Sequence, residues 1–269
     1  QFWLAEATYR KNDYARAERA YQQYLRMPGA NRNEYYARGF YGLGWTHFKQ
    51  KQYARAEQQF EDFLGKTGRQ EQKTVIVDAY LRLGDCLFLQ RKYGQSARYY
   101  QQVLDLRYAH LDYAAYQLAE GYYRQNKYQQ SVNTFDQMIS RYRDSELRDN
   151  ALDRISEIYA TWIKNNSQAL KYARMLVEEY PRSPLAADGL NRMAIASFNA
   201  GSQDAAISYF KKVLTDYAND QKNAKIALDN LSSLLAEREF DRVLRDYRNQ
   251  NPQMDTNLAS LVFQTGKDR

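Results

Sequence analysis

A pattern of three residues at four-residue spacing recurs six times along the chain: a small residue, then an aromatic one (alanine in one case), then an aliphatic one. Because residues four apart share one face of a helix, each triplet predicts an amphipathic helix. The first members are spaced 39, 40, 35, 38 and 37 residues apart, which is typical of repeats built from helix pairs. The triplets are Ala17/Tyr21/Leu25, Ala56/Phe60/Leu64, Ser96/Tyr100/Leu104, Ser131/Phe135/Ile139, Ala169/Ala173/Val177 and Ala206/Phe210/Leu214.

A second small residue lies twelve positions before most triplets and predicts a preceding helix that packs closely against the first. These residues are Ala5, Gly44, Gly84, Ala119 and Ala194, and Glu157 is the exception. Polar or glycine-containing turns separate the two helices, and no segment alternates with the period of two that a strand needs. The sequence therefore predicts an all-α solenoid of antiparallel helix pairs, in which each repeat buries its apolar stripe against its neighbours.

The residues of two repeats resemble a known family. Leu43-Gly44 with Tyr53, Ala56, Phe60 and Leu64 resembles the tetratricopeptide repeat (TPR), and Leu83-Gly84 with Tyr93 and Ser96 resembles it again. The resemblance covers nearly the whole chain, although these units are longer than the family's usual 34 residues. It implies a right-handed superhelix and a non-enzymatic role as a scaffold or adaptor for protein–protein interactions.

One junction between repeats carries a more specific resemblance. Tyr180-Pro181-Arg182-Ser183-Pro184 followed by Ala186-Ala187 is similar to a "YPxSxxA" junction of bacterial cell-envelope TPR proteins, such as BamD and YbgF. This implies a periplasmic, outer-membrane-associated location in an outer-membrane assembly, secretion or Tol-Pal-like complex. A cytoplasmic location is the alternative.

The spacing predicts one solenoid over residues 1–269. Its repeats are expected at 1–33, 34–72, 73–109, 110–147, 148–183 and 184–220, with a degenerate seventh at 221–252 and a partial one at 253–269. Phe2 already belongs to a first helix, and Ala259 and Phe263 echo Ala194 and Phe198. We therefore expect a segment of a longer array.

Positive charge is concentrated in the N-terminal part. The net charge is +7, and residues 1–110 carry 18 Lys and Arg against 11 Asp and Glu, whereas the rest of the chain is balanced. Such a field would attract an acidic partner or an anionic surface, although a solvated helix face explains it equally well. Nucleic-acid binding is not favoured, because acidic residues are interleaved and most tyrosines fall at core positions.

The sequence offers little for catalysis. His47, His110 and Cys86 show no catalytic or metal-ligand spacing, and glycine-rich phosphate loops are absent. We predict no enzyme, no metal, no cofactor and no small-molecule substrate, with Cys86 as a buried, inert thiol. No apolar run approaches 18 residues, so no transmembrane segment is predicted.

In the family that the chain resembles, first helices line a concave groove, which would bind a peptide or a partner helix. Carried over by position, the partner-binding residues are Tyr9, Arg10, Tyr41, Trp45, Lys49, Asp85, Tyr116, Glu120, Tyr123 and Arg124, with Arg38 as a further basic contact and Phe48, Leu81 and Phe88 beside them. The lysines and asparagines that clamp chaperone C-termini in some TPR domains are missing. Two alternatives remain: a structural spacer whose groove binds nothing, and nucleic-acid or anionic-surface binding through the basic N-terminal half.

Overall fold

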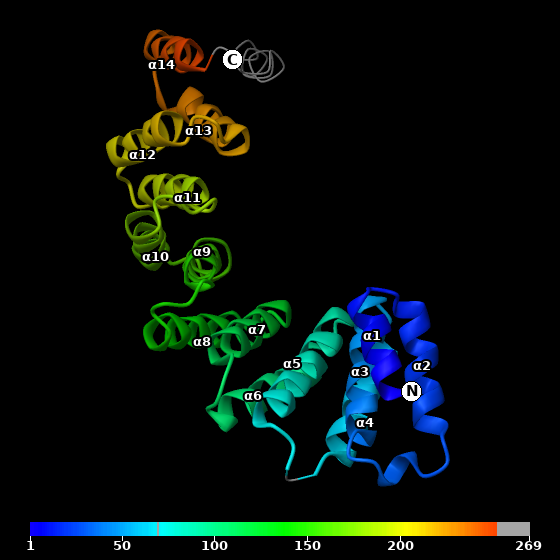
Figure 1. Cartoon of the computed structure of the whole chain (residues 1–269). Coiled ribbons are helices and arrows are strands. Elements are labelled where there is room, and N and C mark those ends of the chain that lie inside the picture. Colours follow the sequence, from blue (N-terminus) through cyan, green and yellow to red (C-terminus); the bar gives the residue numbers. More distant parts are fainter. Residues whose placement is uncertain (69, 252–269) are drawn as a thin grey trace. The chain divides into compact units, whose positions relative to one another are not determined.

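The computed structural model describes residues 1–68 and 70–251, which form fourteen α-helices and no strand (Figure 1). The first helices of the pairs are α1 (Phe2–Arg10), α3 (Tyr36–Lys49), α5 (Lys73–Leu89), α7 (Leu111–Arg124), α9 (Arg148–Ile158), α11 (Ala186–Asn199) and α13 (Gln221–Leu234). The second helices are α2 (Tyr14–Arg26), α4 (Tyr53–Lys66), α6 (Tyr93–Leu106), α8 (Tyr128–Arg141), α10 (Asn166–Glu179), α12 (Gln203–Asp216) and α14 (Glu237–Gln250). The predicted fold class, all-α helix pairs of the TPR type, is confirmed.

The chain divides into two compact parts, which we call unit 1 (residues 1–134) and unit 2 (residues 135–269). The division falls inside α8. The single continuous solenoid stays a prediction, and the partial repeat expected at 253–269 lies outside the described residues.

The small residues hold the two helices of a pair close together, as predicted. A methyl group added to Gly84 would lie only 2.5 Å from the ring of Tyr100, and one added to Gly44 would lie 3.0 Å from Phe60. In the fourth repeat the hydroxyl of Ser131 donates to the backbone oxygen of Ala119 at 2.8 Å. The aromatic ring of each second helix therefore packs directly over the small residue of the first.

The exception at Glu157 has a structural explanation. The fully buried small residue is Ser156, one position earlier, so this repeat contains one extra residue before α10. A π-helical turn, η2 (Tyr159–Ile163), directly follows α9. Such a turn accommodates a single inserted residue without breaking the helix.

The turn inside each of the first six repeats contains one residue in the left-handed conformation. These residues are Asn12, Lys51, Arg91, Asn126, Lys164 and Gly201, with φ between 58° and 82°. Glycine and asparagine adopt this conformation readily, whereas other side chains adopt it at a cost. Three of the six turns therefore use a residue that the backbone does not favour.

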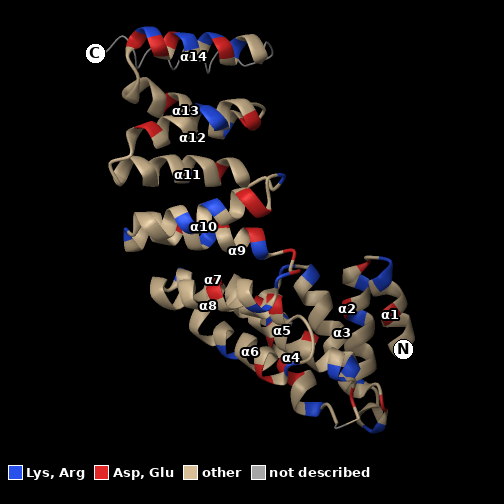
Figure 2. Cartoon of the chain, turned by 90° about the vertical axis from the view of Figure 1, so that its left-hand side faces the viewer, with Lys and Arg blue, Asp and Glu red and all other residues tan. Residues whose placement is uncertain are grey.

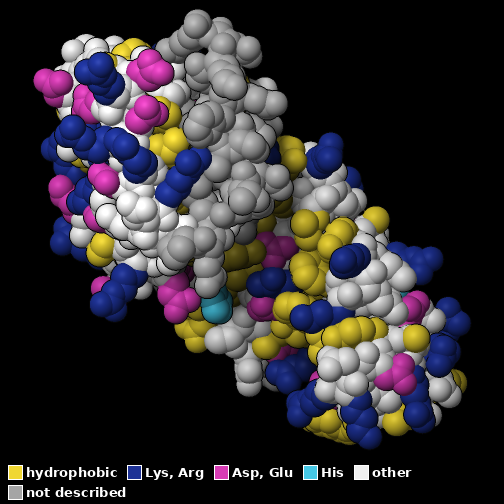
Figure 3. Space-filling view, turned by 90° about the horizontal axis from the view of Figure 1, so that it is seen from above, with side chains coloured by type: hydrophobic (Ala, Val, Ile, Leu, Met, Phe, Trp, Pro, Cys, Tyr) yellow, Lys and Arg dark blue, Asp and Glu magenta, His cyan; other side chains and the backbone are white. Residues whose placement is uncertain are grey.

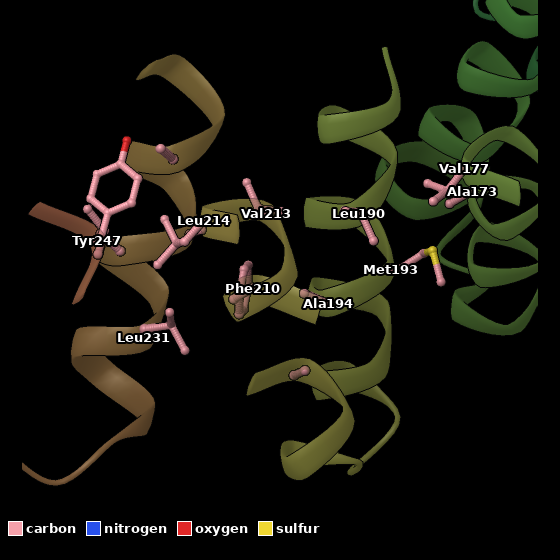
Figure 4. Close-up of a cluster of buried hydrophobic side chains, with 14 of the residues drawn as sticks. Ala173, Val177, Leu190, Met193, Ala194, Phe210, Val213, Leu214, Leu231 and Tyr247 are labelled. Carbon is pink, nitrogen blue, oxygen red and sulfur yellow. The ribbon is translucent and has the colours of Figure 1, made fainter. Parts of the chain in front are cut away.

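Unit 2 has an extended apolar core. Figure 4 shows Phe210 of α12 beside Ala194 of α11, with Leu231 and Tyr247 at the C-terminal end of the same cluster. The last described helix, α14, buries only Leu244 and Tyr247, and charged residues of both signs alternate along it (Figure 2). Apolar clusters of the same kind hold unit 1 together.

Candidate functional site

Three successive first helices of unit 1 are joined by a cluster of polar and aromatic side chains. Asp78 of α5 accepts hydrogen bonds from the Tyr41 hydroxyl at 2.6 Å and from the Trp45 indole nitrogen at 3.1 Å, both on α3. It also pairs with Arg82, one turn further along α5, at 3.3 Å. One carboxylate thus fixes two rings of the preceding repeat.

Asp85, one turn beyond Arg82, is the second anchor. Its carboxylate accepts from the hydroxyl of Tyr100 on α6 at 2.8 Å and from that of Tyr113 on α7 at 2.9 Å, and it pairs with Arg82. The Arg82 guanidinium also lies 5.0 Å from the centroid of the Trp45 ring. We call Tyr41, Trp45, Asp78, Arg82, Asp85 and Tyr113 the inter-repeat cluster.

The tyrosines of this cluster act as hydrogen-bond donors. Burial raises the pKa of Tyr41, and the nearby charge of Asp78 raises it further. Burial and the charge of Asp85 likewise raise the pKa of Tyr113. Both phenols therefore stay protonated at any physiological pH, and the rings keep fixed positions.

The same hydrogen bond between the two helices of a pair occurs in two repeats of unit 1. The residue after the small position is Glu6 in the first repeat and Asp85 in the third, and in each case the tyrosine fifteen residues later donates to it. In the second repeat the residue is Trp45, and the second helix supplies Phe60, which has no hydroxyl. Trp45 instead packs edge-on to Phe60, with ring centroids 6.3 Å apart.

Trp45, predicted as a contact, lies at the centre of this face. It is half-buried, and the Lys49 ammonium lies 5.6 Å from its ring centroid. Tyr41 and Asp85 are also brought together with it, but their polar atoms are occupied by other residues of the chain. Arg38, one turn before Tyr41 on α3, pairs with Glu71 at 2.9 Å.

The remaining predicted contacts lie on α1 and α7. Tyr9 is half-buried against Tyr14, with ring centroids 5.6 Å apart, and burial raises its pKa to about 12. Glu120 is buried and lies 3.9 Å from the exposed Arg124, whose guanidinium is 5.7 Å from the centroid of Tyr123. Arg10 is exposed, and Tyr116 and Tyr123 are half-buried. A binding role for these residues stays a prediction.

Sequence reasoning missed Asp78, Arg82 and Tyr113. The signal was present, because Asp78, Arg82 and Asp85 are spaced four and three residues apart and so share one face of α5. It also missed exposed apolar side chains in unit 2: Trp162 is 49% exposed, Ile195 40% and Phe198 48%. Ile195 and Phe198 occupy on α11 the positions that Trp45 and Phe48 occupy on α3.

Two of the groups considered for catalysis, Cys86 and His47, are buried. Cys86 is fully buried, and burial raises the pKa of its thiol to about 12. His47 is buried with its Nδ1 2.9 Å from the Gln52 side-chain oxygen, and burial lowers its pKa. Over residues 1–68 and 70–251, no group of three or more His, Cys, Asp and Glu could hold a metal ion. None of the helices described is both long and apolar enough to cross a membrane.

The junction at residues 180–184 is an architectural element. The Ser183 hydroxyl donates to Asp149 of the preceding first helix at 2.7 Å and accepts from the backbone N–H of Leu185 at 3.2 Å. The Tyr217 hydroxyl, one repeat further on, donates to the backbone oxygen of Pro181 at 2.8 Å. The motif thus fixes the geometry between consecutive repeats.

Comparison with known families agrees with this geometry. Two sequence models described as "Tetratricopeptide repeat" match residues 3–71 and 41–109, and residues 113–145 and 150–183, which together cover more than half of the chain. None of the curated proteins matches the sequence.

Several solved structures share the fold at low sequence identity. The C-terminal part of a TPR repeat-containing protein from Cytophaga hutchinsonii has a TM-score of 0.73 and 13% identity, covering 97% of this chain and 98% of that one. YrrB, described as a TPR protein with an unusual peptide-binding site, has a TM-score of 0.53 and 18% identity over 69% of this chain and 87% of its own. MamA has a TM-score of 0.55 and 15% identity over 67% of this chain and 97% of its own.

Proposed function

Because the chain belongs to the tetratricopeptide repeat family, we propose that it is a non-enzymatic scaffold whose unit 1 holds an extended peptide or a partner helix on its first helices. The observation that carries this proposal is the inter-repeat cluster. It fixes Tyr41 and Trp45 in place before any partner arrives. Rings that are already ordered lose little conformational entropy on binding.

The charges of this face indicate what kind of segment it would hold. Arg82 is neutralised by Asp78 and Asp85, and Arg124 lies beside Glu120. Paired charges of this kind do not attract an acidic segment strongly. The partner on this face is therefore a segment held mainly by apolar and aromatic side chains, with Trp45 as the central contact.

The proposal extends to the cellular setting. The junction at residues 180–184 resembles that of bacterial envelope TPR proteins, which supports a partner in a periplasmic, outer-membrane-associated complex. YrrB, with a similar fold, is described by its peptide-binding site, which supports a peptide as the ligand class.

A variant that keeps Trp45 as the sole tryptophan tests the binding face directly. The variant Trp3→Phe/Trp162→Phe serves as the target on which twelve-residue peptides displayed on phage are selected. We expect selected synthetic peptides to shift the emission of Trp45 and to lose about 2 kcal/mol or more of binding free energy in Trp45→Ala. Most of that loss should appear as faster dissociation.

The matched control keeps Trp162 as the sole tryptophan, in Trp3→Phe/Trp45→Phe. Peptide-dependent emission from Trp162 with none from Trp45 would move the site to unit 2. If no peptide is selected from the library, the structural spacer becomes the better explanation.

A further inference from the structure

The turns inside the four repeats of unit 1 each expose a cation. These residues are Lys11, Lys51, Arg91 and Lys127; the third turn also holds Lys92, which pairs with Glu57, and the first turn also exposes Asp13. None of the four cations forms an ion pair with a described residue. Because all first helices end at the turns, the four cations share one edge of unit 1, which we call the basic edge.

Two of these cations occupy positions where the backbone favours another residue. Lys51 and Arg91 have φ of 61° and 62°, in the left-handed region, where the equivalent residues of the first and fourth repeats are Asn12 and Asn126. A side chain other than glycine or asparagine is strained in this conformation. Charge is thus kept at these two turns although it lowers stability.

The asparagines also make a hydrogen bond that the cations cannot make. The Tyr14 hydroxyl donates to the Asn12 side-chain oxygen at 2.8 Å, and the Tyr128 hydroxyl donates to that of Asn126 at 2.9 Å. The corresponding Tyr53 and Tyr93 follow Lys51 and Arg91, and their hydroxyls have no partner in the described part of the chain. Both phenols therefore remain available at the edge.

Apolar surface accompanies this charge. Leu89, the last residue of α5, is 50% exposed and lies two residues before Arg91. On the face seen in Figure 3, Lys and Arg side chains outnumber acidic ones over the lower right of the view, where unit 1 lies, and apolar side chains lie among them. Cations, tyrosines and an exposed leucine together suit the interface between water and a bilayer.

We propose that the basic edge of unit 1 binds the anionic surface of a phospholipid bilayer. A charged lipid surface meets at least one cation from each of these four repeats at once, whereas an acidic peptide needs pockets between the cations. Nucleic acid would need exposed rings for stacking, and the rings at this edge are engaged: Phe48 with Tyr53 at 5.6 Å and Phe88 with Tyr93 at 5.1 Å. This site is separate from the peptide-binding face proposed above.

The test measures co-sedimentation of the full chain with vesicles of phosphatidylcholine alone and of phosphatidylcholine with about one-third phosphatidylglycerol. We expect binding only to the anionic vesicles and a marked loss on raising the salt to ~0.15 M. Lys51→Asn/Arg91→Asn should weaken this binding roughly twenty-five-fold, since each cation near such a surface contributes about fivefold. The same variant should unfold at a higher temperature than the parent, so weaker binding could not be ascribed to misfolding.

The matched control is Arg32→Asn/Arg107→Asn, which removes the same charge from the loops between repeats. Arg107 also has a positive φ, of 48°, so the control relieves similar strain. An equal loss of vesicle binding in both variants would show that net charge alone explains the binding, and would overturn the proposal. It would also be overturned if Lys51→Asn/Arg91→Asn left vesicle binding unchanged, or if those residues governed binding to single-stranded DNA or polyglutamate but not to vesicles.

Discussion

Units 1 and 2 use the same register of small and large residues but cover their first helices differently. Four residues after the small position lies an aromatic ring: Tyr9, Phe48, Phe88 and Tyr123 in unit 1, and Phe198 on α11 of unit 2. In unit 1 each ring packs against the tyrosine that begins the second helix, with centroids between 5.1 and 6.0 Å apart. In unit 2 that position holds Gln203, and Phe198 is 48% exposed.

The second difference concerns the residue after the small position. Asp85 in unit 1 is fixed by Arg82, Tyr100 and Tyr113, whereas Ile195 in unit 2 is 40% exposed. Arg192 occupies on α11 the position of Arg82 on α5, yet it pairs with Asp153 at 2.7 Å and Ser156 at 2.6 Å on the preceding first helix. The same helix skeleton thus carries a polar, ordered face in unit 1 and leaves apolar side chains uncovered in unit 2.

The largest expected effect tests whether units 1 and 2 share the same register of buried residues. Phe60→Ala in unit 1 and Phe210→Ala in unit 2 should each cost about 3–5 kcal/mol in the free energy of unfolding. Both rings are at most 1% exposed, so truncating either one leaves a cavity in a packed core. Urea unfolding of each variant measures the loss. A cost below about 1 kcal/mol at either site would show that the two registers are not equivalent.

Exchanging the small residues between the units should have the next largest effect. Gly84→Ala places a methyl group 2.5 Å from Tyr100 and should cost about 1–3 kcal/mol through overpacking. Ala194→Gly, the reverse exchange in unit 2, should cost only about 1 kcal/mol through backbone entropy and lost packing. If Gly84→Ala proved neutral in thermal unfolding, the close approach of α5 and α6 would be refuted.

The sequence predicted the helix pairs because the four-residue spacing of Ala56, Phe60 and Leu64 depends only on local helix geometry. It also placed Trp45, Tyr41 and Asp85 on one face of unit 1 through the family resemblance. It could not predict that Asp78 would bind Tyr41, 37 residues away, because that contact depends on the rotation between neighbouring repeats. The exposure of Phe198 was readable, since Gln203 replaces the tyrosine that covers the equivalent rings.

Mild acidification should destabilise unit 1 more than unit 2. Both histidines of the chain, His47 and His110, lie in unit 1. Burial lowers the pKa of His47 below its ordinary value of 6.5, so the unfolded state binds a proton more readily than the folded state. Its contribution to stability is therefore complete above pH 6.5 and is lost as the pH falls below that value. The loss should be about 1 kcal/mol per pH unit over that window.

Urea unfolding at neutral and mildly acidic pH measures this change. The variant His47→Gln should flatten the dependence, because it removes the buried imidazole. An unchanged slope in His47→Gln would assign the acid sensitivity to carboxylates.

The smallest effect should come from giving unit 2 the ring pair of unit 1. Gln203→Tyr places a tyrosine at the start of α12, nine residues after Ala194, as Tyr53 follows Gly44. It should cover Phe198 and stabilise unit 2 by about 0.5–1 kcal/mol, the usual value of an edge-on aromatic pair. A double-mutant cycle with Phe198→Ala isolates the coupling between the two rings. Gln203→Tyr could stabilise the Phe198→Ala variant as much as it stabilises the parent. The gain would then come from the start of α12 alone, and the missing tyrosine would not explain why Phe198 is exposed.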